Sequence, residues 1–215
     1  MLKLVSNFID YYDHYFDLQG DVLRRLSNEG MNRVEMLQFL QQKNLTVPLH
    51  GIVKNLQNHS LIERDTYVIV HTDIHSHRGE NKHLLLYRDA LERYPDELMV
   101  LYVSSFQGCS WRYLKIGSRS FILHYQSKDW RSNWDTEKIT IEDENASLIN
   151  IDVNEPLFAI DFVKNINENG EAVMMAIDYN IAPQLKGTGI ENILAPAEVA
   201  NLIKESWMRS QKTMW

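Results

Sequence analysis

The dipeptide Asn169-Gly170 constrains the fold of this 215-residue chain more than any other feature of its sequence. Asn-Gly is a strong short-range signal for a β-hairpin, because both residues accept the positive φ angles of a two-residue type I′ turn. Apolar segments flank the dipeptide at 157–163 and 173–180. Counting outward from the turn, with Glu168 opposite Glu171, matches apolar residues with apolar residues. The sequence therefore predicts two antiparallel strands joined at this turn.

The same register places two acidic side chains opposite each other, Asp161 and Asp178. Directly opposed residues on antiparallel strands lie about 4.5–5.5 Å apart at Cβ, where like charges repel. This arrangement indicates a cation between them. Asn180 projects from the same face as Asp178, because side chains alternate along a strand. Two carboxylates and one amide suit Mg²⁺, and Ca²⁺ fits less well. The alternative is that these residues cap the strand end in water without a metal.

The spacing of apolar residues divides the chain into three zones: a helical segment (1–58), a second zone rich in antiparallel sheet and a third zone that contains the hairpin. Apolar residues at helical spacing predict helices around 22–26, 34–40 and 90–94, and after Pro196. Apolar runs and turn signals predict strands at 67–70, 84–86, 99–103, 113–116 and 121–125. The expected class is α+β with much antiparallel sheet.

Composition excludes several classes of function. The net charge of -7, with no run of Lys or Arg, argues against nucleic-acid binding. Cys109 is the single cysteine, so no intrachain disulfide can form. The sequence has neither a signal peptide nor the roughly 20 consecutive apolar residues that span a bilayer. We therefore expect a cytoplasmic protein that does not enter a membrane.

Three segments carry a family resemblance: Ile160-Asp161-Phe162, Ile177-Asp178-Tyr179-Asn180-Ile181-Ala182-Pro183 and Gly187-Thr188-Gly189. Together they resemble the carboxy-terminal metal-binding signature of the ATP-grasp superfamily. The resemblance implies a two-lobed ATP-grasp-like fold that binds ATP and Mg²⁺. The segment 59–103 would be the small lobe that covers the nucleotide, and 104–215 would be the larger lobe with the metal-binding hairpin. It also implies that the metal ligands are Asp161, Asp178 and Asn180, with Asp178 in a position where the family usually has Glu.

The resemblance extends upstream through looser motifs. It implies that the residues in contact with the nucleotide are Arg33, His71, Arg78, Lys82, Leu101 and Val103. Among these, Arg33 and His71 stand where the family has phosphate-binding lysines, and 78–82 would be a mobile loop over the phosphates. The resemblance further implies that the catalytic residues are Arg112, Arg131 and Asn133. The alternative for both arginines is an ordinary surface ion pair.

The function implied by the resemblance is that of an ATP-dependent ligase, which joins a carboxylate to an amine through an acylphosphate. The substrates would be small molecules or peptides. A catalytically inactive nucleotide-binding or structural protein is the alternative, supported by His71 and by the short stretch before Arg33. For the same reason, a second copy or a partner protein is expected to complete the substrate cleft. A zinc site built from His71, Asp73, His75 and His77 is a weaker alternative, because their spacing matches no familiar zinc motif.

Overall fold

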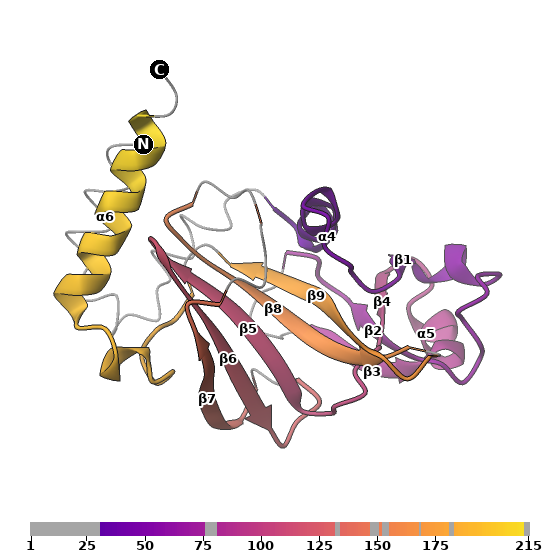
Figure 1. Ribbon diagram of the computed structural model, residues 1–215. Helices are drawn as coiled ribbons and strands as arrows, with labels where there is room; N and C mark the ends of the chain where they lie inside the picture. Colours follow the sequence, from indigo (N-terminus) through magenta and orange to yellow (C-terminus); the bar gives the residue numbers. More distant parts are fainter. Residues whose placement is uncertain are drawn as a thin grey trace.

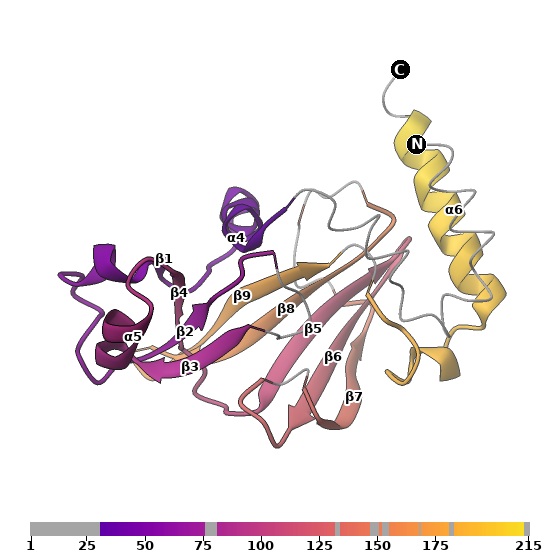
Figure 2. The ribbon, with the colours of Figure 1, turned by 180° about the vertical axis from the view of Figure 1, so that it is seen from behind.

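The computed structural model describes residues 31–75, 81–131, 134–146, 151, 155–167, 169–180 and 183–212. They form two antiparallel sheets with flanking helices, so the expected α+β class is confirmed. Figures 1 and 2 show the four-stranded sheet at one end of the five-stranded sheet and helix α6 at the other end. The helix expected over 22–26 lies outside the described residues. No helix among the described residues is long and apolar enough to cross a lipid bilayer.

The small sheet has the strand order β1-β4-β2-β3. Its strands are β1 (His50–Ile52), β4 (Leu98–Leu101), β2 (Tyr67–His71) and β3 (Lys82–Leu86). The short helices η1 (Val53–Leu56) and α5 (Tyr87–Arg93) pack on it, and the Tyr87 hydroxyl donates to the Val53 carbonyl at 2.8 Å. Strand β1 precedes residue 58, so this sheet includes part of the segment that we expected to be helical.

The large sheet has the strand order β7-β6-β5-β8-β9. Its strands are β7 (Thr136–Glu144), β6 (Arg119–Ser127), β5 (Cys109–Ile116), β8 (Leu157–Ile166) and β9 (Ala172–Asn180). Alternate side chains bury two separate cores. One lies under η2 (Ile190–Asn192) and α6 (Pro196–Lys212), and the other lies under α4 (Arg33–Gln42).

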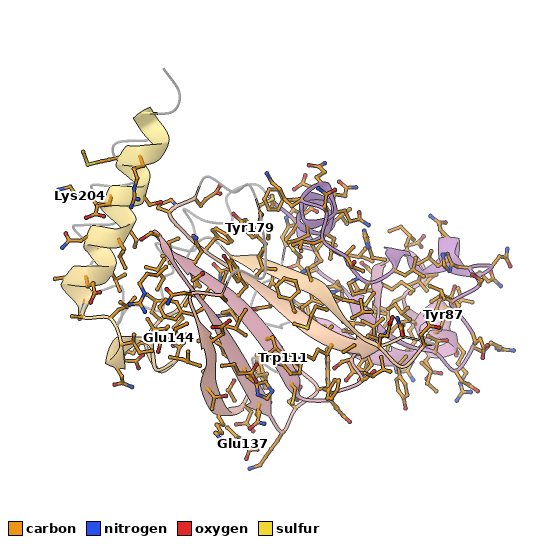
Figure 3. The ribbon with its side chains drawn as sticks, viewed as in Figure 1. Tyr87, Trp111, Glu137, Glu144, Tyr179 and Lys204 are labelled. Atoms are coloured by element: carbon orange, nitrogen blue, oxygen red, sulfur yellow. The ribbon has the colours of Figure 1, made fainter. Side chains whose placement is uncertain are left out.

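Helix α4 begins at a complete capping box. The Asn32 side chain accepts hydrogen bonds from the N–H groups of Val34 and Glu35, and the Glu35 carboxylate accepts from the Asn32 N–H at 2.8 Å. These bonds satisfy N–H groups that a helix start leaves free. The buried side of α4 packs against the large sheet, where Phe39 meets Tyr179 with ring centroids 4.7 Å apart (Figure 3). The cap therefore fixes where Arg33, the first helical residue, lies.

The β8–β9 hairpin confirms that Asp161 and Asp178 pair directly, although the predicted register near its turn was wrong by one residue. Ile166 pairs with Ala172, because the Asn167 side chain accepts hydrogen bonds from the N–H groups of Asn169 and Glu171 and closes the turn one residue earlier. A β-bulge opposite Asp161 and Phe162 then shifts the register by one residue and restores the predicted pairing of Asp161 with Asp178. The bulge leaves Ile177 without a partner on β8.

Strand β7 is absent from the sequence-based prediction. Its exposed positions carry charged side chains, and only partly buried residues such as Ile139 and Ile141 face the core. From the sequence alone, a segment of this composition is indistinguishable from a polar loop, because propensity for β-structure depends on the neighbouring strand.

The backbone of Gly117 packs closely against α6. Its φ is +58°, and a Cβ there would lie 2.3 Å from the Leu202 carbonyl oxygen of α6. Gly117→Ala should therefore lower the free energy of unfolding by about 2 kcal/mol, since it combines left-handed strain with a backbone clash. Gly170→Ala is the matched control, because Gly170 also has positive φ but no atom within 4 Å of a Cβ. It should cost about 1 kcal/mol in the same urea titration, and equal costs would contradict a packing role for Gly117.

Candidate nucleotide and metal site

Asp161 lies on β8 and is only 3% exposed. It accepts two hydrogen bonds from Arg112 on β5, from Nε to Oδ1 at 2.6 Å and from Nη2 to Oδ2 at 2.8 Å. The third Arg112 nitrogen, Nη1, donates to the Tyr125 hydroxyl at 3.3 Å. Burial opposes the charge on Arg112, but the Asp161 carboxylate outweighs it and raises the pKa of the guanidinium above its ordinary value. The Arg112 guanidinium therefore stays charged and is fixed to Asp161 under the site.

Asp178 lies opposite on β9, and its side chain is 38% exposed. Its Oδ1 accepts from Nη1 of Arg33 and from the Tyr179 N–H, both at 3.1 Å. Burial raises the pKa of this carboxyl group, but Arg33, Lys82 and Arg112 lower it below its usual value. Within the described residues, Oδ2 has no hydrogen-bond partner. One oxygen of Asp178 is therefore held by protein and the other is available to a ligand.

His71 and Lys82 are direct cross-strand partners on β2 and β3. His71 is 5% exposed, and its pKa falls to about 2 through burial and the positive charges of Arg33 and Lys82. It is therefore a neutral imidazole at physiological pH. Burial, Arg33 and Arg131 lower the pKa of Lys82 to about 8, against the opposing effect of Asp178 and Asp161. Lys82, which begins β3 rather than lying in a loop, supplies the ammonium beside His71.

The donor set fits a hard divalent cation. Asn180 pairs with Ala159, two residues from both aspartates along each strand, so its amide lies on their face of the sheet. The Asp178 and Asp161 carboxylates and the Asn180 amide carry oxygen donors of the kind that such a cation prefers. The zinc alternative finds no support in the described residues, which contain no group of three or more His, Cys, Asp or Glu placed to hold a metal. His77 lies outside them.

The remaining predicted residues are placed unequally. Arg131 is bound through Nε and Nη2 to the Asp129 carboxylate, at 2.8 and 3.0 Å, and its guanidinium lies over the Trp134 ring at 4.4 Å. Its positive charge contributes to the lowered pKa of Lys82. Arg78 and Asn133 lie outside the described residues.

The segment after β4 presents backbone groups. The N–H of Leu101 donates to Leu49 and that of Tyr102 donates to Tyr67, at 2.7 and 3.1 Å. In the described part of the chain, the backbone N–H and C=O of Val103 have no hydrogen-bond partner. Among the predicted contacts here, Val103 is the residue with backbone groups available to a ligand.

Tyr125 belongs to the site but was not predicted from the sequence. Its ring lies 5.0 Å from the Arg112 guanidinium carbon, and burial raises the pKa of its hydroxyl, so it stays protonated. The pairing of β5 with β6 is what reveals it. Tyr125 pairs with Ser110, and Arg112 lies two residues from Ser110 on β5, so Tyr125 and Arg112 project from the same face of the sheet.

No protein-family model matches the sequence, and no curated protein matches it. Solved structures match the fold. The ATP-grasp ligase PsnB, complexed with a phosphomimetic variant of its minimal precursor, Mg and ADP, aligns with a TM-score of 0.52 and 13% identity over 84% of this chain and 60% of that chain. PsnB complexed with precursor peptide PsnA2 and AMPPNP aligns with a TM-score of 0.50 and 12% identity, over 84% and 59% of the two chains.

D-alanine-D-alanine ligase from Coxiella burnetii aligns with a TM-score of 0.48 and 10% identity, over 86% of this chain and 60% of that chain. This chain spans about 60% of the length of the PsnB chains that it matches. Their identities are too low to transfer an activity, and the likeness concerns the fold. On that ground, the chain has the fold of the ATP-grasp ligases.

Proposed function

We propose that this chain binds ATP with Mg²⁺ and works as an ATP-dependent ligase that joins a carboxylate to an amine. One observation carries the proposal: within an ATP-grasp fold, the opposed carboxylates of Asp161 and Asp178 meet the cations Arg33, Lys82 and Arg112. Such a mixed cluster suits a metal together with a polyphosphate, because the anion binds both the metal and the free cation.

Lys82 is the cation that we assign to the phosphates, with Arg131 near it. Arg33 and Arg112 hold the two carboxylates, whereas Lys82 forms no ion pair among the described residues. Burial and the neighbouring arginines lower the pKa of Lys82. Arg112 then acts on Asp161 and fixes its orientation, in place of the direct contact with substrate that the family resemblance implied. The backbone of Val103 would meet the adenine edge.

Bound Mg²⁺ would neutralise charge on the phosphate oxygens. In the proposed reaction a carboxylate oxygen of the substrate attacks the γ-phosphorus, and the bond to ADP breaks. The amine then attacks the acyl carbon, phosphate leaves, and the amine loses a proton. Lys82 and Arg131 hold the transferred phosphoryl group through this sequence, and no enzyme nucleophile is needed.

The second candidate is a nucleotide-binding protein without turnover. It is favoured by His71, which is neutral where the family has a lysine. Phosphate release from ATP, in the presence of carboxylates and amines that include short peptides, separates the two candidates. Nucleotide binding without acid- and amine-dependent phosphate release would favour the inactive protein.

The metal-nucleotide site itself is tested by thermal unfolding. ATP with Mg²⁺ at 100 times its Kd should stabilise the fold by about 2.7 kcal/mol, because the ligand binds the native state alone. For a chain of this size that raises the Tm by about 5–10 °C. Asp178→Asn should remove most of this response. Asp65→Asn, which breaks the exposed ion pair between Asp65 and Arg88, is the control and should keep it. If calorimetry detects no binding at millimolar nucleotide, the proposed metal-nucleotide site is refuted and only the assignment of the fold remains.

A further inference from the structure

The Arg33 side chain, for which the family resemblance implies a contact with the nucleotide phosphates, is bound to protein groups. The side chain is 9% exposed, and its Nη1 donates to Asp178 Oδ1 at 3.1 Å and to the Ile177 carbonyl at 3.2 Å. Both acceptors belong to β9, at the bulge beside the opposed carboxylates. The guanidinium is therefore bound to the strand that carries the expected metal ligands.

The bulge explains why this contact matters for a metal. Ile177 is the extra residue of β9, because the bulge leaves it without a paired residue on β8. The Arg33 guanidinium gives the Ile177 carbonyl a hydrogen-bond partner at 3.2 Å. The same nitrogen binds one oxygen of the adjacent carboxylate. One side chain therefore fixes both the bulge that brings Asp178 opposite Asp161 and the rotation of the Asp178 carboxylate.

Arg33 is itself held in place from two sides. The capping box at Asn32 and Glu35 fixes the start of α4. The backbone N–H of Arg33 donates to the Ile74 carbonyl at 2.9 Å, in the segment that follows β2 of the small sheet. One residue thus connects the small sheet, α4 and the bulge of β9.

We propose that Arg33 is a positioning residue for the metal site, which orients Asp178 so that Oδ2 faces the cation, and that it is not a contact for the nucleotide phosphates. This inference rests on the proposed function, because it presumes a cation between Asp161 and Asp178. Neither the sequence motifs nor the fold comparison assigns this role to Arg33.

The test measures metal and nucleotide binding separately on the full chain. Mn²⁺ is titrated without nucleotide and followed by electron paramagnetic resonance, and AMPPNP is titrated in EDTA by calorimetry. Arg33→Met should weaken Mn²⁺ binding about 10-fold, the range found when groups that orient metal ligands are removed. AMPPNP affinity in EDTA should change by less than about twofold. Arg88→Met, which removes an exposed arginine from the ion pair with Asp65, is the matched control and should change neither value.

A second variant covers the case in which Arg33→Met does not fold. Arg33→Lys keeps the charge but loses the planar fork that meets two acceptors, so Mn²⁺ binding should still weaken. Unchanged Mn²⁺ affinity in the folded variants would overturn the inference, as would a loss of AMPPNP affinity in EDTA as large as the loss for Mn²⁺. In both cases the wild-type protein still binds ATP with Mg²⁺, so the proposed function survives. Wild-type protein that binds neither Mn²⁺ nor AMPPNP overturns both.

Discussion

Arg112→Met should lower the free energy of unfolding by about 3–5 kcal/mol, because it leaves the Asp161 carboxylate buried without its counter-ion. Asp161 is 3% exposed and both of its oxygens accept from Arg112. Solvent cannot replace those bonds without opening the sheet between β5 and β8. Urea unfolding at pH 7, followed by circular dichroism, measures the loss.

Arg119→Met provides a matched control on the neighbouring strand. Arg119 also pairs with a carboxylate, that of Glu144 at 3.1 Å, and its guanidinium carbon lies 5.0 Å from the Phe121 ring, as that of Arg112 does from Tyr125. Its pair is exposed to solvent, however, so the cost should stay below about 1 kcal/mol. The double change Arg112→Met with Asp161→Leu should recover part of the lost stability, because no unpaired charge remains. Similar costs for Arg112→Met and Arg119→Met would contradict this reading of the buried pair.

Lys82→Met should lower the affinity for ATP with Mg²⁺ about 100-fold, because it removes the ammonium that we assign to the phosphates. The estimate corresponds to about 2.7 kcal/mol, within the usual cost of removing one partner of a buried charged contact. Calorimetry measures the affinity directly. Lys54→Met is the control, since Lys54 forms an exposed ion pair with Asp96 on the surface of the small lobe. A loss below threefold for Lys82→Met would remove Lys82 from the phosphate site.

The affinity should also depend on pH through Lys82. Its pKa of about 8 lies below the ordinary 10.5, so the free protein loses the ammonium as pH rises above 8. Phosphate charge favours the protonated form, and binding at pH 8.5–9 should therefore take up protons and weaken as pH rises. Without nucleotide, the free energy of unfolding should depend on pH in the opposite direction. The contribution of Lys82 to this free energy is greatest above pH 10.5, where the side chain is neutral in both states, and is lost as pH falls through 8. Lys82→Met should abolish both dependences.

Much of the fold follows from local patterns. Helix α4 and strands β2, β3, β8 and β9 coincide with segments predicted from apolar spacing, because each buries one face and its period is visible within a few residues. The opposition of Asp161 and Asp178 was also predicted, although two one-residue displacements, at the Asn167 turn and at the Ile177 bulge, cancel between the turn and the site. This prediction was possible because the two strands of the hairpin are adjacent along the chain.

By itself, the sequence determined the class of the fold and the pair of opposed carboxylates, because both are set by contacts between residues close along the chain. The tertiary structure decided which cation serves which carboxylate. Arg33 and Asp178 are 145 residues apart, and Arg112 and Asp161 are 49 apart. Lys82 became the ammonium beside His71 only through the pairing of β2 with β3. Such partners are chosen by the packing of distant strands and by the desolvation of charge, and neither leaves a periodic signal in the sequence.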